Sequence, residues 1–390
     1  MQPIPISEFK RRLPDQLSLL RTLVEMESPT TDKPALDAVG RFVAEHMAQR
    51  GAKVSAYPQA RAGDHWLGTW EPSAASGDAD RLAGSEKKGA ILLLTHLDTV
   101  YPTGTLARMP CYEEDGRLYG PGVLDMKSGV AIALIALETL RAVDRQAPRA
   151  VRLLCTSDEE TGSYTSRELI EGLAREHELV LCLEPGLPDG ALKTWRKGIG
   201  DFRLEASGRS AHAGNIPQEG VNAILEMAFQ LQRLAALADD GAGTTMNVGR
   251  IEGGTRTNVV PDACVARLEF RVLDRAEQER VQNALDRVTP IIEGAQVRLE
   301  GGWNRPPMPR TPEMIAAFER AKGIAAGLGL ELKEGGTGGG SDANFVAPLG
   351  VPVIDGLGAV GKGAHSEREH ILLASLPKRT ALLAALLTEW

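Results

Sequence analysis

Six side chains in five separate segments have the types that bind divalent metal ions. The segments are LLLTHLDTV, GPGVLDMKSG, LLCTSDEETGS, LCLEPG and GKGAHSEREH, and their candidate residues are His96, Asp125, Glu159, Glu160, Glu184 and His365. Each candidate lies at the end of an expected strand or in the loop beyond it. One such residue alone would usually be a cap or a surface group. Because open α/β sheets place their chemistry at strand ends, we expect the six together to form one two-metal active site.

Two neighbouring divalent ions require oxygen and nitrogen ligands and a carboxylate that bridges them. We expect His96 and Glu184 to hold one ion, Glu160 and His365 to hold the other, and Asp125 to lie between the two. Three carboxylates and two divalent cations leave a net charge of about +1, which a bridging hydroxide would neutralise. Histidine and carboxylate ligands suit zinc and also accept cobalt or manganese.

Asp98 and Glu159 have different expected roles. Asp98 follows His96 in THLDT and lies on the same side of an extended strand, so its carboxylate is expected to accept the N–H of the imidazole nitrogen that does not bind metal. Glu159 and Glu160 would point in opposite directions in an extended segment. We therefore predict that Glu160 binds metal and that Glu159 is the general base for the metal-bound water.

Helices and strands alternate around these segments. The expected strands are 52–57, 90–94, 150–155 and 179–183, and the expected helices are 8–27, 35–50, 128–143 and 166–176. Short Val/Ile/Leu-rich runs separated by helices predict an α/β fold with a mostly parallel sheet covered by helices on both faces. The Ser/Ala/Gly/Asp-rich stretch Glu71–Gly89 is predicted to be a surface loop or the tip of a hairpin.

The order of elements changes between about Gly198 and Asn304. Strands are expected at 201–207, 244–251, 263–273 and 296–300, with helices at 220–238 and 276–288. This β-α-β-β-α-β order is typical of a ferredoxin-like domain. Helix and strand alternation resumes after Pro306. We therefore expect a catalytic domain of residues 1–197 and 305–390, into which residues 198–304 are inserted.

The composition indicates a globular protein, with 43% hydrophobic and 25% charged residues among 390. A net charge of -8 argues against nucleic acid or an anionic membrane as the main partner. No apolar run has the length of a signal or a membrane span, so a cytoplasmic location is expected. The four cysteines lack CxxC spacing and are expected to be free thiols. Four other histidines are expected at the surface: His46, His65, His177 and His370.

In their order along the chain, these segments resemble the co-catalytic zinc metallopeptidases, a family that includes carboxypeptidase G, acetylornithine deacetylase, succinyl-diaminopimelate desuccinylase and aminoacylase. The resemblance covers essentially the whole chain. It implies the metal ligands given above, a cis peptide bond after Asp125 and hydrolysis of an amide bond next to a free carboxylate. It also implies a homodimer formed through the inserted domain.

Two further segments match this family. GRSAHAG resembles a motif whose histidine, here His212, reaches into the partner subunit's active site and stabilises the oxyanion. TGGGSDANF resembles a substrate loop, in which Gly339 would let the substrate approach the backbone closely.

The basic residues that would touch substrate are most similar to those of the carboxypeptidase G branch. By this resemblance, Arg271 would bind the substrate α-carboxylate and Asn258 would assist at the scissile carbonyl. Arg305 in WNRPP and Lys193 in ALKTWRKG would meet the glutamate side chain, and Arg196 and Lys197 compete with Lys193 for that role. The resemblance implies release of a C-terminal glutamate from N-acyl or peptidyl substrates, with folate-like acyl groups as one option.

Two other functions remain open. One is an N-acyl-amino-acid amidohydrolase or deacetylase of different specificity. The other is a non-catalytic dimeric scaffold, which would be expected to lack some of the metal ligands that are all present here. A GxGxxG pattern formed by Gly356, Gly358 and Gly361 is rejected as a dinucleotide site, because no helix is expected to follow it.

Overall fold

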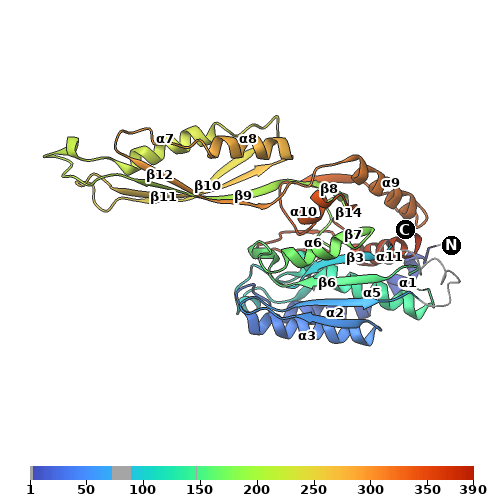
Figure 1. The fold of residues 1–390 in the computed structure, drawn as a ribbon. Coiled ribbons are helices and arrows are strands. Elements are labelled where there is room, and N and C mark those ends of the chain that lie inside the picture. The colour runs from blue at the N-terminus through green and yellow to red at the C-terminus, as the bar shows by residue number, and fades with distance from the viewer. Residues whose placement is uncertain (1–2, 73–88, 146) are drawn as a thin grey trace. The chain divides into compact units, whose positions relative to one another are not determined.

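The computed structural model describes residues 3–72, 89–145 and 147–390, so most of the loop predicted at Glu71–Gly89 lies outside the described residues. The chain divides into two compact units (Figure 1). The first comprises Met1–Trp195, Arg310–Thr337 and Ser341–Trp390, and the second comprises Arg196–Pro309 and Gly338–Gly340. Each unit has a hydrophobic core of its own.

The first unit is built around a six-stranded sheet of order β1-β2-β6-β3-β7-β14. These strands are β1 (Lys53–Tyr57), β2 (His65–Trp70), β3 (Ile91–His96), β6 (Val151–Thr156), β7 (Leu179–Cys182) and β14 (Val353–Ile354). The four strands from β6 to β14 are parallel, and β1 and β2 are antiparallel additions at one edge. Every residue of β3 is buried. Since successive side chains point to opposite faces, both faces of the sheet are covered, and the predicted fold class is confirmed.

Helices supply that cover. They are α1 (Ile6–Arg11), α2 (Leu13–Glu25), α3 (Lys33–Gln49), α5 (Ser128–Ala142), α6 (Arg167–Arg175), α9 (Pro312–Ala326), α10 (Ala343–Val346) and α11 (Leu376–Glu389). Helix α5 is buried over most of its length and packs against α11, α2 and β3. The single helix predicted at 8–27 is wrong, because the chain forms two helices that meet at Arg12. Pro14 lacks a backbone N–H and is tolerated only in the first turn of the second helix.

Two small sheets complete the first unit. Strand β8 (Leu192–Arg196) pairs with β13 (Glu334–Thr337), and a four-stranded sheet has the order β15-β16-β5-β4. Its strands are β4 (Tyr112–Glu114), β5 (Arg117–Tyr119), β15 (Gly361–Lys362) and β16 (His370–Leu372). Because β15 and β16 are antiparallel neighbours, the loop between them, which contains His365, is fixed at both ends.

The second unit is a four-stranded antiparallel sheet of order β10-β11-β9-β12 with two helices. Its elements are β9 (Gly198–Ser207), α7 (Ala223–Ala235), β10 (Thr245–Gly253), β11 (Ala263–Val272), α8 (Arg275–Leu285) and β12 (Gln296–Arg305). Both helices lie on one side of the sheet (Figure 1), and buried residues alternate along β9 accordingly. The predicted ferredoxin-like order of elements is confirmed. Within the described residues, no helix is long and apolar enough to cross a membrane.

Candidate active site

Three neighbouring parallel strands bring the predicted ligands to one edge of the large sheet. His96 is the last residue of β3, Glu160 lies in a short 3-10 turn after β6, and Glu184 follows the end of β7. Asp125 precedes α5, in a turn with non-helical backbone angles. The turn begins at Gly122, where φ is 71° and a Cβ would lie 2.5 Å from a side-chain atom of Thr99. The Asp125–Met126 peptide bond is cis, as the resemblance implies.

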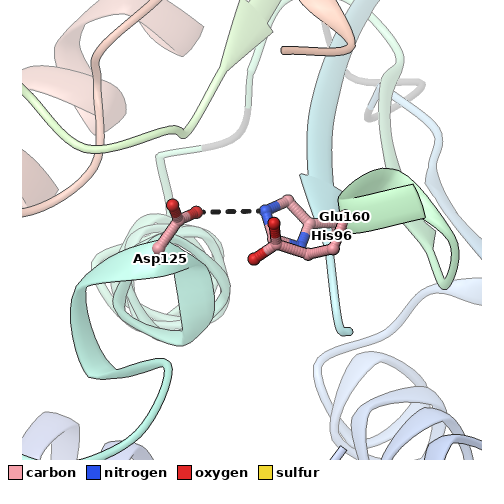
Figure 2. A group of neighbouring side chains, drawn as sticks. All are labelled: His96, Asp125 and Glu160. Carbon is pink, nitrogen blue, oxygen red and sulfur yellow. Dashed lines mark hydrogen bonds and ion pairs between the residues drawn. The ribbon is translucent and has the colours of Figure 1, made fainter. Parts of the chain in front are cut away.

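Asp125 lies between two histidines. Its Oδ1 is 3.2 Å from Nε2 of His96, and its Oδ2 is 3.4 Å from Nε2 of His365. A second carboxylate accompanies each imidazole, with Glu184 Oε1 3.6 Å from His96 Nε2 and Glu160 Oε2 3.2 Å from His365 Nε2. Figure 2 shows three of these side chains converging. The structure thus brings the five predicted ligands together in the predicted pairs.

The chemistry of this cluster fits divalent metal ions. His96, Asp125 and Glu160 each offer a ligand atom within 4.8 Å of the others. Glu160 Oε1 is buried and has no hydrogen-bond partner in the part of the chain that the structure describes. A buried carboxylate oxygen without a donor is costly unless a cation neutralises it. Imidazole nitrogen and carboxylate oxygen are the ligands that zinc and related ions accept.

The carboxylates of this cluster raise the pKa values of its two histidines, His96 and His365, and so favour their protonated form. Contacts with Asp125 and then Glu160 raise the pKa of His365 to about 11. Burial opposes a charge on His96, but hydrogen bonds to Asp125, Asp98 and Glu184 raise its pKa well above the usual value. Burial raises the pKa of Glu160. The acidic groups therefore attract positive charge, as a cation site requires.

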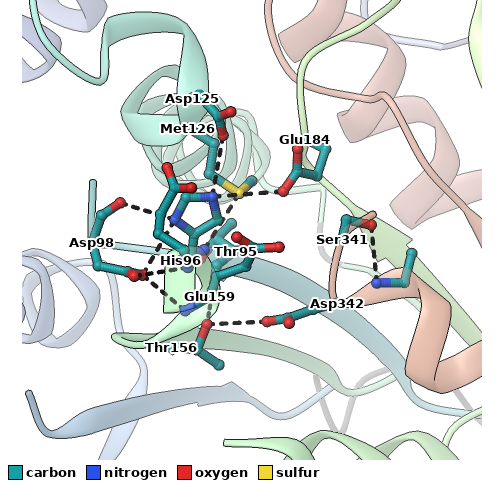
Figure 3. A network of polar contacts seen from close by, with 12 residues as sticks. Thr95, His96, Asp98, Asp125, Met126, Thr156, Glu159, Glu184, Ser341 and Asp342 are labelled. Atoms are coloured by element: carbon teal, nitrogen blue, oxygen red, sulfur yellow. Dashed lines mark hydrogen bonds and ion pairs between the residues drawn. The ribbon is translucent and has the colours of Figure 1, made fainter. Parts of the chain in front are cut away.

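Asp98 is completely buried and organises the loop after β6. Its Oδ1 accepts the N–H of Glu159 at 3.2 Å (Figure 3). Its Oδ2 accepts the N–H of Glu160 at 3.0 Å and the hydroxyl of Thr30 at 2.8 Å. The Nδ1 atom of His96 is 3.0 Å from the backbone oxygen of Asp98 and 3.4 Å from its Oδ1. The nearer acceptor for the imidazole is therefore the backbone carbonyl. The carboxylate mainly fixes the two glutamates.

Glu159 and Glu160 lie in a 3-10 turn, Glu159–Thr161, and not in the extended segment expected from the sequence. The difference arises because the N–H groups of Glu159 and Glu160 both bind the one carboxylate of Asp98 and so face the same side. The side chain of Glu160 is only 7% exposed, whereas Glu159 is partly exposed.

The second unit contains most of the residues that were predicted to bind substrate. His212 and Asn258 are exposed and adjacent, because His212 forms a bridge with Val259 and Asn258 O accepts the N–H of Ala213. Nδ1 of His212 accepts the backbone N–H groups of Gly214 and Asn215, each at 3.1 Å. Its proton is therefore on Nε2, which makes Nε2 a hydrogen-bond donor.

The predicted basic residues have varied surroundings. Arg271 on β11 forms an ion pair with Glu269 at 2.6 Å and donates to Gly338 O at 2.6 Å. Arg305, at the end of β12, is 4% exposed and packs beside Gly340, where a Cβ would lie 2.6 Å from its Cδ. Lys193, in the first unit, is buried in β8. From the sequence, Arg196 was an alternative to Lys193 for contact with the glutamate side chain of the substrate.

Arg196 is 2% exposed and donates through Nη1 to the carbonyl oxygens of Gly339 and Gly340, at 3.1 and 2.8 Å. It therefore supports the backbone of the glycine segment. The carbonyl oxygen of Gly339 is thus held by Arg196, and the predicted role of Gly339 in substrate approach stays a prediction.

Some sequence-based expectations are wrong. His65 and His177 were predicted to be exposed, but they are 0% and 6% exposed. The ring of His65 bonds the hydroxyl of Thr165, and the ring of His177 bonds the carbonyl oxygen of Leu173. One nitrogen of each ring therefore has a hydrogen-bond partner, which lowers the free-energy cost of burying the ring. The four cysteines are free, as predicted.

Comparison with known proteins identifies the family. The model of peptidase family M20/M25/M40 matches residues 92–389, and the chain belongs to this metal-dependent family of peptidases and amidohydrolases. It is 28% identical to carboxypeptidase G2 of Pseudomonas sp. (strain RS-16), over 96% of this chain and 89% of the relative. It is 33% identical to succinyl-diaminopimelate desuccinylase of Dechloromonas aromatica, over 75% of this chain and 81% of that one.

Solved structures show the same fold. A tripeptidase from Staphylococcus aureus has a TM-score of 0.78 with 20% identity, covering 96% of this chain and 97% of its own. An M20 family metallo-carboxypeptidase from Sulfolobus solfataricus has a TM-score of 0.71 with 17% identity, covering 95% and 98%. The resemblance to a zinc-metallopeptidase family is therefore confirmed at the level of family and fold.

Proposed function

We propose that the protein is a di-metal carboxypeptidase or amidohydrolase that cleaves the amide bond to a C-terminal amino acid. The observation that carries this proposal is the position of Asp125, whose two oxygens lie 3.2 and 3.4 Å from the imidazoles of His96 and His365. With Glu184 and Glu160, this donor set supports two divalent ions, and zinc is the simplest choice, with cobalt and manganese as alternatives. The proposal assigns catalysis to the first unit.

When bound, such ions would polarise the amide carbonyl and lower the pKa of a water molecule to near neutrality. We assign Glu159 as the general base, because its backbone is fixed by Asp98 and its side chain is partly open to solvent. Its carboxylate would take a proton from water and return it to the leaving nitrogen, which is the usual dual role of such a group.

The base is tested by Glu159→Gln. We expect normal metal content and a kcat lower by about 10²–10⁴-fold, the usual contribution of a general base. Glu168→Gln, an equal change at an exposed position in the first turn of α6, is the control and should be neutral. Full turnover in Glu159→Gln would remove this residue from the mechanism.

We further propose that the second unit forms a homodimer and that His212 acts at the partner subunit's active site. Its exposed Nε2–H can donate to a developing oxyanion. Apolar side chains that suit a contact surface are exposed on α7 and on the neighbouring edge strand β10: Ile224, Leu225, Phe229, Val248 and Ile251. An unpaired edge strand readily pairs with another chain.

Mixing two inactive variants tests the dimer directly. If the histidine acts in trans, Glu159→Gln and His212→Ala fall in the same active site of a mixed dimer, so the other site of that dimer is intact. Partial recovery of activity on mixing is expected, together with a dimer mass in light scattering. A monomer with full activity would refute the proposal.

For the substrate, we propose a C-terminal glutamate on an N-acyl or peptidyl group, with folate-like acyl groups included. Likeness to carboxypeptidase G2 over nearly the whole chain supports this choice. A charged hydrogen bond contributes about 1.5–3 kcal/mol, so Arg305→Ala should weaken glutamyl substrates about ten- to a hundredfold and neutral ones much less. Arg298→Ala, at an exposed position on the same strand, is the control. Equal losses for both substrate types would refute the glutamate assignment.

A second candidate is an amidohydrolase that removes a small acyl group from another amino acid. Its support is the 33% identity to a succinyl-diaminopimelate desuccinylase. A panel of N-acetyl, N-succinyl and N-benzoyl amino acids, assayed with zinc-loaded protein, separates the two candidates. No bound metal and no hydrolysis would instead favour a non-catalytic scaffold.

A further inference from the structure

Glu369 is a buried carboxylate outside the predicted ligand set. It is 0% exposed and lies just before β16, in the same loop as His365. Its Oε1 accepts the backbone N–H groups of Leu124 at 2.8 Å and Asp125 at 3.0 Å. Its Oε2 accepts the N–H of Gly122 at 3.2 Å. One side chain therefore binds three backbone donors of the turn that presents Asp125.

The residue at the N-cap of this turn, Gly122, has no side chain that could cap it. The residues before α5 depart from helical geometry, with φ -114° and ψ 94° at Asp125, and no side chain of the helix N-cap residue accepts a hydrogen bond. Glu369, from a distant part of the sequence, accepts the N–H groups of Gly122, Leu124 and Asp125, which all lie in the turn before α5.

Tyr101 extends the connection to the histidine loop. Its hydroxyl donates to Glu369 Oε2 at 2.5 Å and also lies 3.0 Å from the carbonyl oxygen of Ser366. Ser366 directly follows His365, whose backbone has a left-handed φ of 61°. The N–H of Gly120 additionally approaches Glu369 O at 3.4 Å. The loop of His365 and the turn of Asp125 are thus joined through one buried carboxylate and one hydroxyl.

We infer that Glu369, supported by Tyr101, is a positioning residue that fixes Asp125 and His365 relative to each other and so sets the affinity of the site for metal. The inference rests on the proposed two-metal function. Glu369 acts through backbone contacts and does not itself reach the predicted ligand atoms. Groups that orient metal ligands typically change metal affinity by about 10–100-fold when they are removed.

Glu369→Gln isolates this role. The amide has the same size but only one oxygen, so its NH2 must face either the N–H pair of Leu124 and Asp125 or the N–H of Gly122. At least one of these contacts becomes donor against donor. We expect zinc to bind about 10–100-fold more weakly, measured by chelator competition on the folded, metal-free protein. Excess zinc should restore much of kcat.

Two further variants separate geometry from charge and from folding. Glu367→Gln removes a carboxylate from the same loop at an exposed position and should leave zinc affinity unchanged. Tyr101→Phe changes no charge and leaves the three backbone bonds of Glu369 intact, so a smaller loss, roughly three- to tenfold, is expected. If Glu369→Gln does not fold without metal, the zinc affinity of Tyr101→Phe tests the inference in its place.

The outcomes are distinct. Zinc affinity within about twofold of the parent protein in folded Glu369→Gln, or in Tyr101→Phe where the first variant is unfolded, would overturn the inference. An equal loss in Glu367→Gln would also overturn it, because the effect would then be one of net charge. Failure of the unmodified protein to bind zinc would instead contradict the proposed function.

Discussion

Replacing Asp98 by asparagine measures how far the site depends on one buried carboxylate. Its two oxygens accept the N–H groups of Glu159 at 3.2 Å and Glu160 at 3.0 Å, and Oδ2 also accepts the hydroxyl of Thr30 at 2.8 Å. Asparagine has the same size but offers a single oxygen. Its NH2 group must therefore face one of the two backbone N–H groups, whichever way the amide is turned.

A buried donor left without an acceptor costs about 1–3 kcal/mol, and we expect Asp98→Asn to lower the free energy of unfolding by this amount. The pKa of Asp98 contributes a further dependence on pH. Burial raises that pKa, but contacts with His96, with the hydroxyl of Thr30 and with the N–H of Glu160 together lower it by more, so the net shift is downward from 3.8. A lowered pKa stabilises the protein above pH 3.8, and the contribution is lost as the pH falls. The deficit of the variant should therefore be full at neutral pH and shrink in acid.

Urea unfolding of chelator-treated protein, repeated from pH 7 into acid, measures this deficit without metal binding. The turnover of N-acyl-glutamate by zinc-loaded protein should also fall, because the base Glu159 loses its backbone anchor. Thr30→Val removes one hydroxyl donor and leaves the carboxylate in place, so its effect should be clearly smaller. An Asp98→Asn variant within about 0.5 kcal/mol of the parent protein, with unchanged kcat/KM, would refute the reasoning.

Other perturbations test the packing and charge around the site. A Cβ at Gly129 would lie 2.3 Å from the carbonyl oxygen of Leu183, so Gly129→Ala should lower stability in urea by about 1–3 kcal/mol; unchanged unfolding would show that α5 can shift. Chelation should abolish hydrolysis, and zinc at a hundred times its Kd should raise the free energy of unfolding by about 2.7 kcal/mol; a Tm indifferent to zinc would contradict zinc binding at this site. In metal-free protein the pKa of His365 is raised from 6.5 to about 11, chiefly by Asp125. Its stabilisation is complete below pH 6.5 and is lost as the pH rises towards 11, so urea midpoints should decline more steeply across this range than in His365→Ala.

The ligand cluster could be predicted because its members follow neighbouring parallel strands. His96 ends β3, and Glu160 and Glu184 follow the strands on either side of it. Strand order alone therefore brings these three side chains to a common edge. Asp125 and His365 lie in loops, so strand order does not place them near the other three ligands. Their residue types, which bind metal, were sufficient to predict that they join the same site.

Glu369 could not be found in this way, since its partners are backbone N–H groups that carry no signature in the sequence. A glutamate in SEREH has the pattern of a solvated charge, and only the fold shows that it is completely buried. By contrast, the ion pair of Arg271 with Glu269 could have been predicted from the sequence. The two residues are on the same side of one strand, so their contact follows from the two-residue period of a strand.

Two buried carboxylates, Asp98 and Glu369, support the site from different segments, and both are satisfied by hydrogen bonds from the protein alone. The backbone around the ligands is therefore held in place before metal binds. Repulsion among the ligand carboxylates is offset in the metal-free protein by protons, because the pKa values of His96 and His365 are raised. Metal must displace those protons in order to bind the imidazoles. It follows that acid should weaken metal binding through competition at the histidines, while the turn of Asp125 and the loop of Glu159 keep their conformations.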